Sequence, residues 1–309
     1  MKTFFRLSAI ALATSFAFAA PATAGYTSTK NPIVLVHGLF GFNNFLGADY
    51  FYGVKDTLTK EGAVVYTSTV SAAGSNETRG EQLRAELRRI RAASGNPNMK
   101  FNLIGHSQGS PTSRYVAAVE PGLVASVTSV GGVNKGSKVA DIVRKVAPTG
   151  SISESVMTSV ANAFVSLLAL ATGSSQLPQS SIDALDSLTT PGLTKFNAKY
   201  PAGVPSACGE GAYAVNGIRY YSWGGSTPFT NLFDPLDGGI SVMSLAFGGE
   251  ANDGLVGACS QRLGKVIRVD YKMNHLDEIN GFFGIVHLFE TNPKSVYRSH
   301  ANRLQTAGL

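Results

Sequence analysis

The stretch Phe101-Asn102-Leu103-Ile104-Gly105-His106-Ser107-Gln108-Gly109 decides the fold of this 309-residue chain. It begins as an apolar run typical of a buried strand and continues into a G-x-S-x-G sequence, after which residues 108–120 are compatible with a helix. In this context the motif places a serine on a strained turn, and small residues two positions away let the strand and the helix approach closely. We therefore interpret Ser107 as a nucleophile.

Strands and helices alternate on both sides of this motif. Leu83, Leu87 and Ile90 recur at helical spacing, and Gly95 ends that helix. The alternation predicts a mostly parallel central sheet flanked by helices. No repeat or low-complexity linker divides the chain, so we expect one domain over residues 25–309. We expect strands at residues 32–36, 63–69, 101–104, 124–133, 220–223 and 265–269.

Basic residues are concentrated in the helix that contains Leu83 and Leu87. We interpret them as the solvated face of an amphipathic helix and expect no nucleic-acid partner. Charged residues are only 15% of the chain and hydrophobic residues 44%, which excludes a disordered chain or a charge-driven scaffold. The basic residues are Arg79, Arg84, Arg88, Arg89 and Arg91.

The first 24 residues have the pattern of a secretory signal peptide. Lys2 and Arg6 precede an apolar run over residues 7–20, and Ala22-Thr23-Ala24 is typical of a cleavage site. The run is shorter than the roughly 20 residues needed to span a bilayer. We therefore expect a secreted protein, and removal of these two basic residues lowers the formal charge from +6 to +4.

The two cysteines, Cys208 and Cys259, allow only one intramolecular pairing. Disulfides persist in oxidising compartments, so export favours the bond, which would close a loop of about 50 residues and contribute about 2–4 kcal/mol. The alternative is a pair of unpaired buried thiols. Neither cysteine is part of a C-x-x-C motif, which disfavours metal or redox catalysis.

Residues 151–175 interrupt the alternation with an amphipathic helix. Val156, Val160 and Phe164 recur at helical spacing, while serines and an asparagine occupy the other side. One interpretation is a core helix that covers the sheet. The other is a mobile apolar lid or an element that lies on a membrane surface.

A serine nucleophile needs a histidine base and an acid, and in strand-turn-helix hydrolases these follow the serine in the order acid, then histidine. Of the three later histidines, His275 follows the last predicted strand, whereas we expect His287 and His300 in helices. Asp253 precedes Gly254 in a turn and is the preferred acid, with Asp234 second. Two other candidates are Asp237 and Asp270; the latter is too near His275 in sequence to turn back easily.

The oxyanion of a tetrahedral intermediate needs two backbone N–H donors. One comes from the residue after the nucleophile, Gln108, and the other from a loop after an early strand, where Leu39 follows His37-Gly38. The alternative for His37-Gly38 is an ordinary turn at the end of a strand.

These residues resemble the secreted bacterial true lipases, or triacylglycerol lipases, of the Pseudomonas type. The resemblance implies an α/β-hydrolase fold with a helical lid and hydrolysis of acylglycerols at lipid–water interfaces. It also implies one structural Ca²⁺, one disulfide, a membrane-anchored folding chaperone and an extracellular location reached via the periplasm and across the outer membrane. The matching stretches are residues 32–42 (PIVLVHGLFGF), 102–109 (NLIGHSQG), 114–119 (RYVAAV), 196–201 (FNAKYP), 207–211 (ACGEG), 251–257 (ANDGLVG) and 273–278 (MNHLDE).

By position, the resemblance implies a triad of Ser107, Asp253 and His275, with Leu39 and Gln108 as oxyanion donors. It also implies a bridge from Cys208 to Cys259.

The calcium site is implied by the resemblance alone. The carboxylates of Asp234 and Asp277 and the backbone carbonyls of Gly281 and Ile285 would hold the ion, which fits the oxygen ligands that calcium prefers. Gly281 replaces a glutamine found in some relatives, and Ser110 replaces a glycine common after the nucleophile motif.

The leading hypothesis is a monomeric secreted triacylglycerol lipase. The alternative enzyme is a carboxylesterase or polyesterase for short or soluble esters, which would use the same triad. A catalytically silent binding module is disfavoured because all three triad residues are present.

Overall fold

The computed structural model describes residues 25–39, 41, 49–172 and 179–309. The predicted signal peptide, residues 1–24, lies outside the described residues, as does the end of the predicted lid region, residues 173–175. In the part of the chain that the structure describes, no helix has the length and apolarity needed to cross a membrane.

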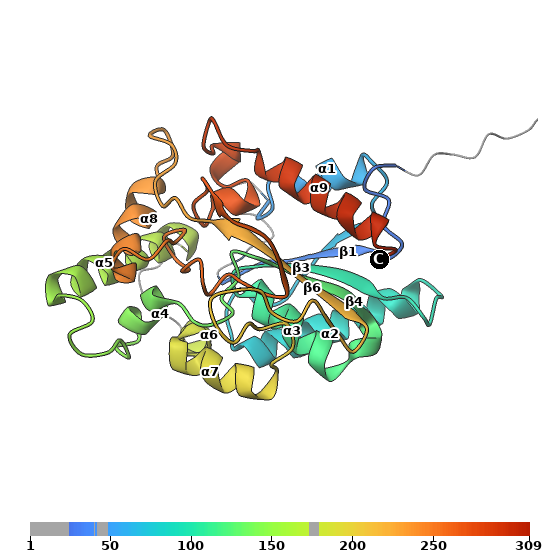
Figure 1. Ribbon diagram of the computed structural model, residues 1–309, viewed down its shortest axis with the longest axis horizontal. Helices are drawn as coiled ribbons and strands as arrows, with labels where there is room; N and C mark the ends of the chain where they lie inside the picture. The colour runs from blue at the N-terminus through green and yellow to red at the C-terminus, as the bar shows by residue number, and fades with distance from the viewer. Residues whose placement is uncertain (1–24, 40, 42–48, 173–178) are drawn as a thin grey trace, which may run out of the picture.

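The described residues form a seven-stranded sheet through the centre of the molecule (Figure 1). Its order is β2-β1-β3-β4-β6-β5, and β7 also pairs with β6. Every pairing is parallel except that of β5 with β6, which confirms the predicted α/β architecture. The strands are β1 (Ile33–Val36), β2 (Val65–Thr67), β3 (Phe101–His106), β4 (Val124–Val130), β5 (Ala214–Val215), β6 (Ile218–Gly225) and β7 (Lys265–Tyr271).

Helices follow or connect these strands. The α-helices are α1 (Val54–Thr59), α2 (Asn76–Ala93), α3 (Gly109–Val119), α4 (Lys138–Val143), α5 (Glu154–Thr172), α6 (Gln179–Leu188), α7 (Thr190–Lys199), α8 (Asp237–Met243) and α9 (Pro293–Thr306). The short 3₁₀ helices are η1 (Pro121–Leu123), η2 (Ser244–Phe247), η3 (Asp277–Ile279) and η4 (Phe282–Gly284).

Strand β1 is apolar at every position because helices cover both faces of the sheet. Ile33 and Leu35 pack into the core on the side of α1 and α9, where Tyr297 also lies. Val34 and Val36 point to the other face and pack with residues of α2 and α3. Figure 1 shows these two helix layers above and below the sheet.

Helices α4 to α8 form a third group beyond one end of the sheet (Figure 1). Val139, Phe164, Leu188 and Ile240 come from four of these helices and belong to one apolar cluster. The first, third and fourth strands end near this group, so it covers the carboxyl ends of the parallel strands, where α/β folds place their sites.

The arginine-rich helix is α2, and its prediction needs one correction. Arg84 and Arg88 are partly exposed and pair with Glu120, as expected of a solvated face. Arg79 is instead completely buried, and its guanidinium donates to the backbone carbonyls of His37 and Ser71. It therefore braces the end of β1 rather than facing solvent.

Candidate active site

Ser107 lies on a tight turn between β3 and α3. Its φ of 55° is in the left-handed region, which non-glycine residues rarely adopt. A Cβ at Gly105 would overlap the backbone of Gly109, and a Cβ at Gly109 would overlap the carbonyl of Val36. The two glycines of the motif are therefore required by the close approach of β3, α3 and β1, as the sequence predicted.

His275 and Asp253 come together as predicted. The Nδ1 atom of His275 lies 2.8 Å from Oδ2 of Asp253, and the backbone N–H of His275 donates to the carbonyl of Asp253 at 2.9 Å. Asp253 is completely buried, and its Oδ1 accepts from the N–H groups of Leu255 and Val256. This contact uses Nδ1 of the imidazole and leaves Nε2 to accept a proton.

The structure gives the other acidic candidates different environments. Asp237 is buried and accepts hydrogen bonds from Asn274 and from backbone N–H groups before α8. The Asp270 side chain is 77% exposed and pairs with Arg268 at the surface. Neither carboxylate is hydrogen-bonded to His275, whereas Asp253 is.

The other histidines are also accounted for. His300 is buried in α9, where Nε2 lies 2.7 Å from the hydroxyl of Thr128. His287 lies in a loop, not in the predicted helix. Phe283 and Gly284, a few residues before it, both have positive φ, 52° and 79°. Such values are incompatible with a continuous right-handed helix.

The predicted oxyanion donors lie on the two segments that meet at Ser107. Gln108 immediately precedes α3, whose dipole places partial positive charge at this end of the helix. Leu39 lines the same cavity as Ser107. A Cβ at Gly38 would lie 2.7 Å from Cβ of Ser107, so only glycine lets the Leu39 segment approach the nucleophile this closely.

A chain of hydrogen bonds through Tyr50 and His106 joins these segments. Nε2 of His106 lies 2.9 Å from the carbonyl oxygen of His275. A carbonyl oxygen can only accept, so His106 Nε2 is the donor. Burial lowers the pKa of His106 well below its usual range, so its Nδ1 is unprotonated and accepts from the Tyr50 hydroxyl at 2.7 Å. The Tyr50 oxygen in turn accepts from the N–H of Gly38 at 3.0 Å.

Glu278 is a completely buried carboxyl group beside the triad. Its Oε1 accepts from the N–H of Gly225 at 2.6 Å, and Oε2 lies 3.4 Å from His106 Nε2. Burial, reinforced by the charge of Asp253, raises the pKa of Glu278 well above its usual range. This shift favours the uncharged form of Glu278, and the carboxyl group that is hydrogen-bonded to His275 is that of Asp253.

His106, His275 and Glu278 have ligand atoms within 4.8 Å of one another, a composition compatible with metal binding. His275 Nδ1 is already bonded to Asp253, and His106 uses both ring nitrogens in the Tyr50 chain. We therefore assign this trio to the hydrogen-bond network of the site.

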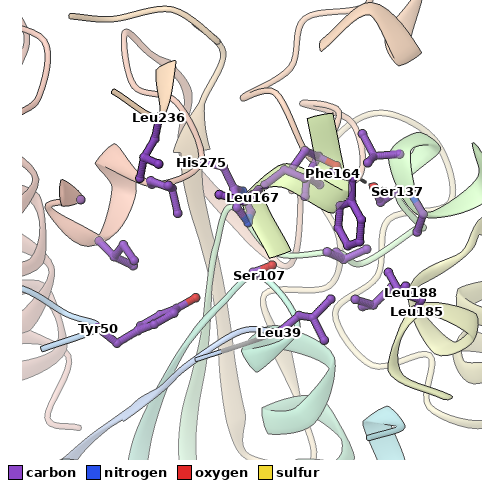
Figure 2. A pocket seen from close by; sticks show the side chains of 18 of the residues that line it. Leu39, Tyr50, Ser107, Ser137, Phe164, Leu167, Leu185, Leu188, Leu236 and His275 are labelled. Atoms are coloured by element: carbon purple, nitrogen blue, oxygen red, sulfur yellow. Dashed lines mark hydrogen bonds between the residues drawn. The ribbon is translucent and has the colours of Figure 1, made fainter. Parts of the chain in front are cut away.

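An apolar cavity of about 150 Å³ opens at Ser107. Figure 2 shows Ser107 at its floor, His275 above it and the hydroxyl of Tyr50 directed toward it. Phe164 and Leu167 of α5 lie over this centre, so α5 covers the cavity rather than a face of the sheet. The apolar residues that complete the lining include Val133, Val139, Leu185, Leu188, Leu236, Leu255 and Val256.

The residues of the implied calcium site lie next to the His275 loop. Within the described residues, Oδ1 of Asp277 is buried without a hydrogen-bond partner. Burial raises the pKa of Asp277 to about 7, and Asp237 and Asp234 add to this shift. Burial likewise raises the pKa of Asp234 to about 6. Gly281 begins the turn into η4, and Ile285 follows it.

Cys208 and Cys259 are thiols in this structure. The two side chains are within hydrogen-bonding reach of each other, and burial together with this contact raises the pKa of the Cys259 thiol to about 11. The pairing of these two cysteines stays a prediction.

Comparison with known proteins shows the family and the fold of this chain. A family model described as the alpha/beta hydrolase fold matches residues 31–235. A triacylglycerol lipase of Vibrio cholerae is 58% identical over 286 residues, which cover 92% of this chain and 91% of that protein. The chain belongs to the bacterial triacylglycerol lipase family. A second member of this family, from Pseudomonas fragi, is 43% identical and matches 91% of this chain and 98% of its own.

Solved structures show the same fold at lower identity. The mature lipase BlEst2 of Bacillus licheniformis superimposes with a TM-score of 0.60 at 19% identity, covering 93% of this chain and 95% of its own. The Staphylococcus hyicus lipase gives 0.58 at 17% identity, covering 90% and 97%. These superpositions confirm that the chain has the expected α/β-hydrolase fold.

Proposed function

We propose that this chain is a secreted triacylglycerol lipase that hydrolyses long-chain acylglycerols at a lipid–water interface. The observation that carries the proposal is a strained serine that opens into an apolar cavity shared with the His275–Asp253 pair and covered by α5. An apolar cavity with few polar groups suits an acyl chain attached to an ester.

In the first half of the reaction, His275 Nε2 removes the proton of the Ser107 hydroxyl as its oxygen attacks the ester carbonyl. Asp253 holds Nδ1–H and stabilises the imidazolium that forms. The N–H groups of Leu39 and Gln108 donate to the oxyanion. The intermediate then collapses, the ester C–O bond breaks, and the imidazolium protonates the departing alcohol.

In the second half, His275 accepts a proton from water, and the resulting hydroxide attacks the acyl-serine carbonyl. Collapse breaks the bond to Oγ, the proton returns to Ser107, and the fatty acid leaves. Asp253 is hydrogen-bonded to Nδ1 of His275, so the same His275–Asp253 pair serves both halves of the reaction.

We infer that Asp234 and Asp277, with the carbonyls of Gly281 and Ile285, hold one structural Ca²⁺. The unpartnered buried oxygen of Asp277 and its raised pKa fit this inference, because a cation would compensate the buried negative charge. Such an ion supplies charge neutralisation and holds in place the loop that carries His275.

Further parts of the proposal concern the whole protein. We propose export through the periplasm with removal of residues 1–24, a Cys208–Cys259 disulfide, and a monomer. We also propose folding assisted by a membrane-anchored chaperone. The helix α5 would act as a lid that moves to admit lipid, which its apolar face over Ser107 supports.

A comparison of substrates tests the function. The purified mature protein is assayed on emulsified long-chain triacylglycerol and on a soluble short-chain ester. We expect a clear preference for the emulsion and a rise in activity when the substrate exceeds its solubility. Equal or better turnover of the soluble ester, with no response to the interface, would instead identify a carboxylesterase or polyesterase.

A further inference from the structure

Large apolar side chains are strongly exposed on two loops near the active site. In the part of the chain that the structure describes, Leu232, Phe233, Leu288 and Phe289 are 81%, 81%, 76% and 89% exposed. No other large hydrophobic residue among the described ones exceeds 55%. We call these four residues, together with the half-exposed Phe229 and Phe283, the apolar rim.

The two loops that carry the apolar rim are fastened to each other. The side-chain amide of Asn231 donates to the carbonyl of Val286 at 2.9 Å. Each loop also has internal bonds, from Phe233 N–H to Asn231 and from Phe289 N–H to His287, both 3.1 Å. Figure 1 shows the loops before α8 and before α9 projecting beyond the helices along the same edge of the molecule. The rim therefore rests on an ordered platform.

The same loops reach the mouth of the catalytic cavity. Leu236 ends the first loop and Phe283 belongs to the second, and both line the cavity that contains Ser107. A surface that contacts the rim is thus continuous with the path by which a substrate reaches the nucleophile.

The loops carry almost no free charge. Residues 226–236 and 281–292 contain no lysine or arginine. Of their two acidic residues, Asp234 is buried and Glu290 pairs with Arg268 at 3.1 Å. An uncharged apolar edge matches an uncharged surface and offers nothing to an anionic partner. Single side chains that project from loop tips also differ from the flat, closely packed faces of stable protein dimers.

We propose that the apolar rim inserts into the surface of a neutral lipid phase and so anchors the enzyme with its cavity mouth facing the lipid. This inference rests on the proposed function, because the lipid phase is the source of substrate. The anchor is separate from α5, so it operates whether or not the lid moves. Insertion removes exposed apolar area from water, which favours binding without dependence on salt.

The test uses two double variants of the calcium-loaded protein, Leu232→Ser/Phe233→Ser and Leu288→Ser/Phe289→Ser. Val64→Ser is the matched control, because Val64 is 55% exposed but precedes β2, at the amino ends of the parallel strands, whereas Ser107 follows β3 at their carboxyl ends. Binding is measured by flotation with triolein droplets coated with phosphatidylcholine. Hydrolysis is measured on the same droplets and on a soluble short-chain ester.

We expect each double variant to bind the droplets at least about tenfold more weakly, with emulsion hydrolysis reduced in proportion and soluble-ester kcat/KM within about twofold. The Val64→Ser protein should bind as the wild type does. NaCl at about 0.5 M screens interactions between exposed charges, so it should not weaken wild-type binding if the contact is apolar.

Unchanged droplet binding by both double variants would overturn the inference. So would a wild-type dimer in sedimentation experiments that the rim substitutions convert to monomer, because the rim would then be a protein interface. A wild type that binds droplets through the rim yet hydrolyses only soluble ester would refute the proposed lipase function while leaving the anchor intact.

Discussion

The hydroxyl group of Tyr50 joins three parts of the site at the scale of single residues. It accepts from the N–H of Gly38, next to the proposed oxyanion donor Leu39, and donates to His106, which in turn donates to the carbonyl of His275. The oxyanion segment, the nucleophile turn and the base are thereby linked through one oxygen atom. Burial keeps this phenol neutral by raising its pKa, so it retains the proton that it donates.

Tyr50→Phe removes that oxygen and leaves the Gly38 N–H and His106 Nδ1 without their partner. We expect kcat/KM to fall about 5- to 30-fold, mostly through kcat, because an unsatisfied buried group costs about 1–2 kcal/mol. Steady-state kinetics on a soluble ester measures this. Tyr52→Phe is the control, since the Tyr52 ring packs against Phe283 outside the Tyr50 chain. Equal loss in both variants, or a change confined to KM, would argue against a positioning role.

Some of the site residues could be predicted from sequence and others could not. Ser107 has a local motif, His275 follows the last parallel strand, and Asp253 precedes a turn glycine, so each has a signal within a few positions. Tyr50 and Glu278 have none, because their partners lie 56 and 53 residues away in the chain. The lone tyrosine and glutamate therefore looked like ordinary residues.

At the scale of elements, the loop after β7 has two tasks. It carries His275, and two residues later Asp277 contributes a buried carboxylate to the proposed calcium site. With no cation, burial raises the pKa of Asp277 and Asp234 above the usual value near 4, so the contribution of these two carboxyl groups to stability is most favourable at acid pH and is lost as pH rises toward 7. A bound cation compensates the charge that develops.

Chelation should therefore lower the melting temperature more at pH 8 than at pH 5. Saturating calcium should contribute about 2–3 kcal/mol at pH 8, and Asp277→Asn should remove this difference. Calorimetry with calcium or chelator at the two pH values is the measurement. Asp270→Asn, at an exposed position paired with Arg268, should keep the wild-type response. A melting temperature indifferent to chelator at pH 8 would rule out a structural calcium ion.

Helix α5 shows why periodicity alone left two interpretations. Its apolar stripe is real, because Val160, Phe164 and Leu168 are all buried. A stripe does not say which surface it covers, and the tertiary structure places it against α4 and α8 over the cavity. Arg79 of α2 is the opposite case. Its place in a basic helix predicted exposure to solvent, but it is buried and its guanidinium donates to the backbone carbonyl of His37.

At the scale of the whole molecule, buried neutral histidines couple folding to pH. Burial lowers the pKa of His300 to about 3 and that of His37 to about 4. The unfolded chain binds protons on these residues below about pH 6.5, whereas the folded protein does not. Their contribution to stability is therefore complete above pH 6.5 and is lost as pH falls toward the folded values.

His300→Gln should make the free energy of unfolding less steeply dependent on pH between 6.5 and 4. One histidine contributes a slope of at most about 1.4 kcal/mol per pH unit. The variant should also lose about 1–3 kcal/mol at pH 7 because the contact with Thr128 is altered. Urea denaturation at several pH values measures both effects. An unchanged slope would exclude His300 as a source of the acid sensitivity.

The central claim is that Ser107 is the nucleophile, activated by His275 and Asp253. The most direct measurement is mass spectrometry of the protein after reaction with an alkyl phosphonate ester, which phosphonylates an activated serine. We predict a single adduct in the peptide that contains Ser107, no adduct and no esterase activity in a folded Ser107→Ala variant, and much slower labelling in Asp253→Asn. An adduct on another residue, or undiminished hydrolysis by Ser107→Ala, would contradict the account.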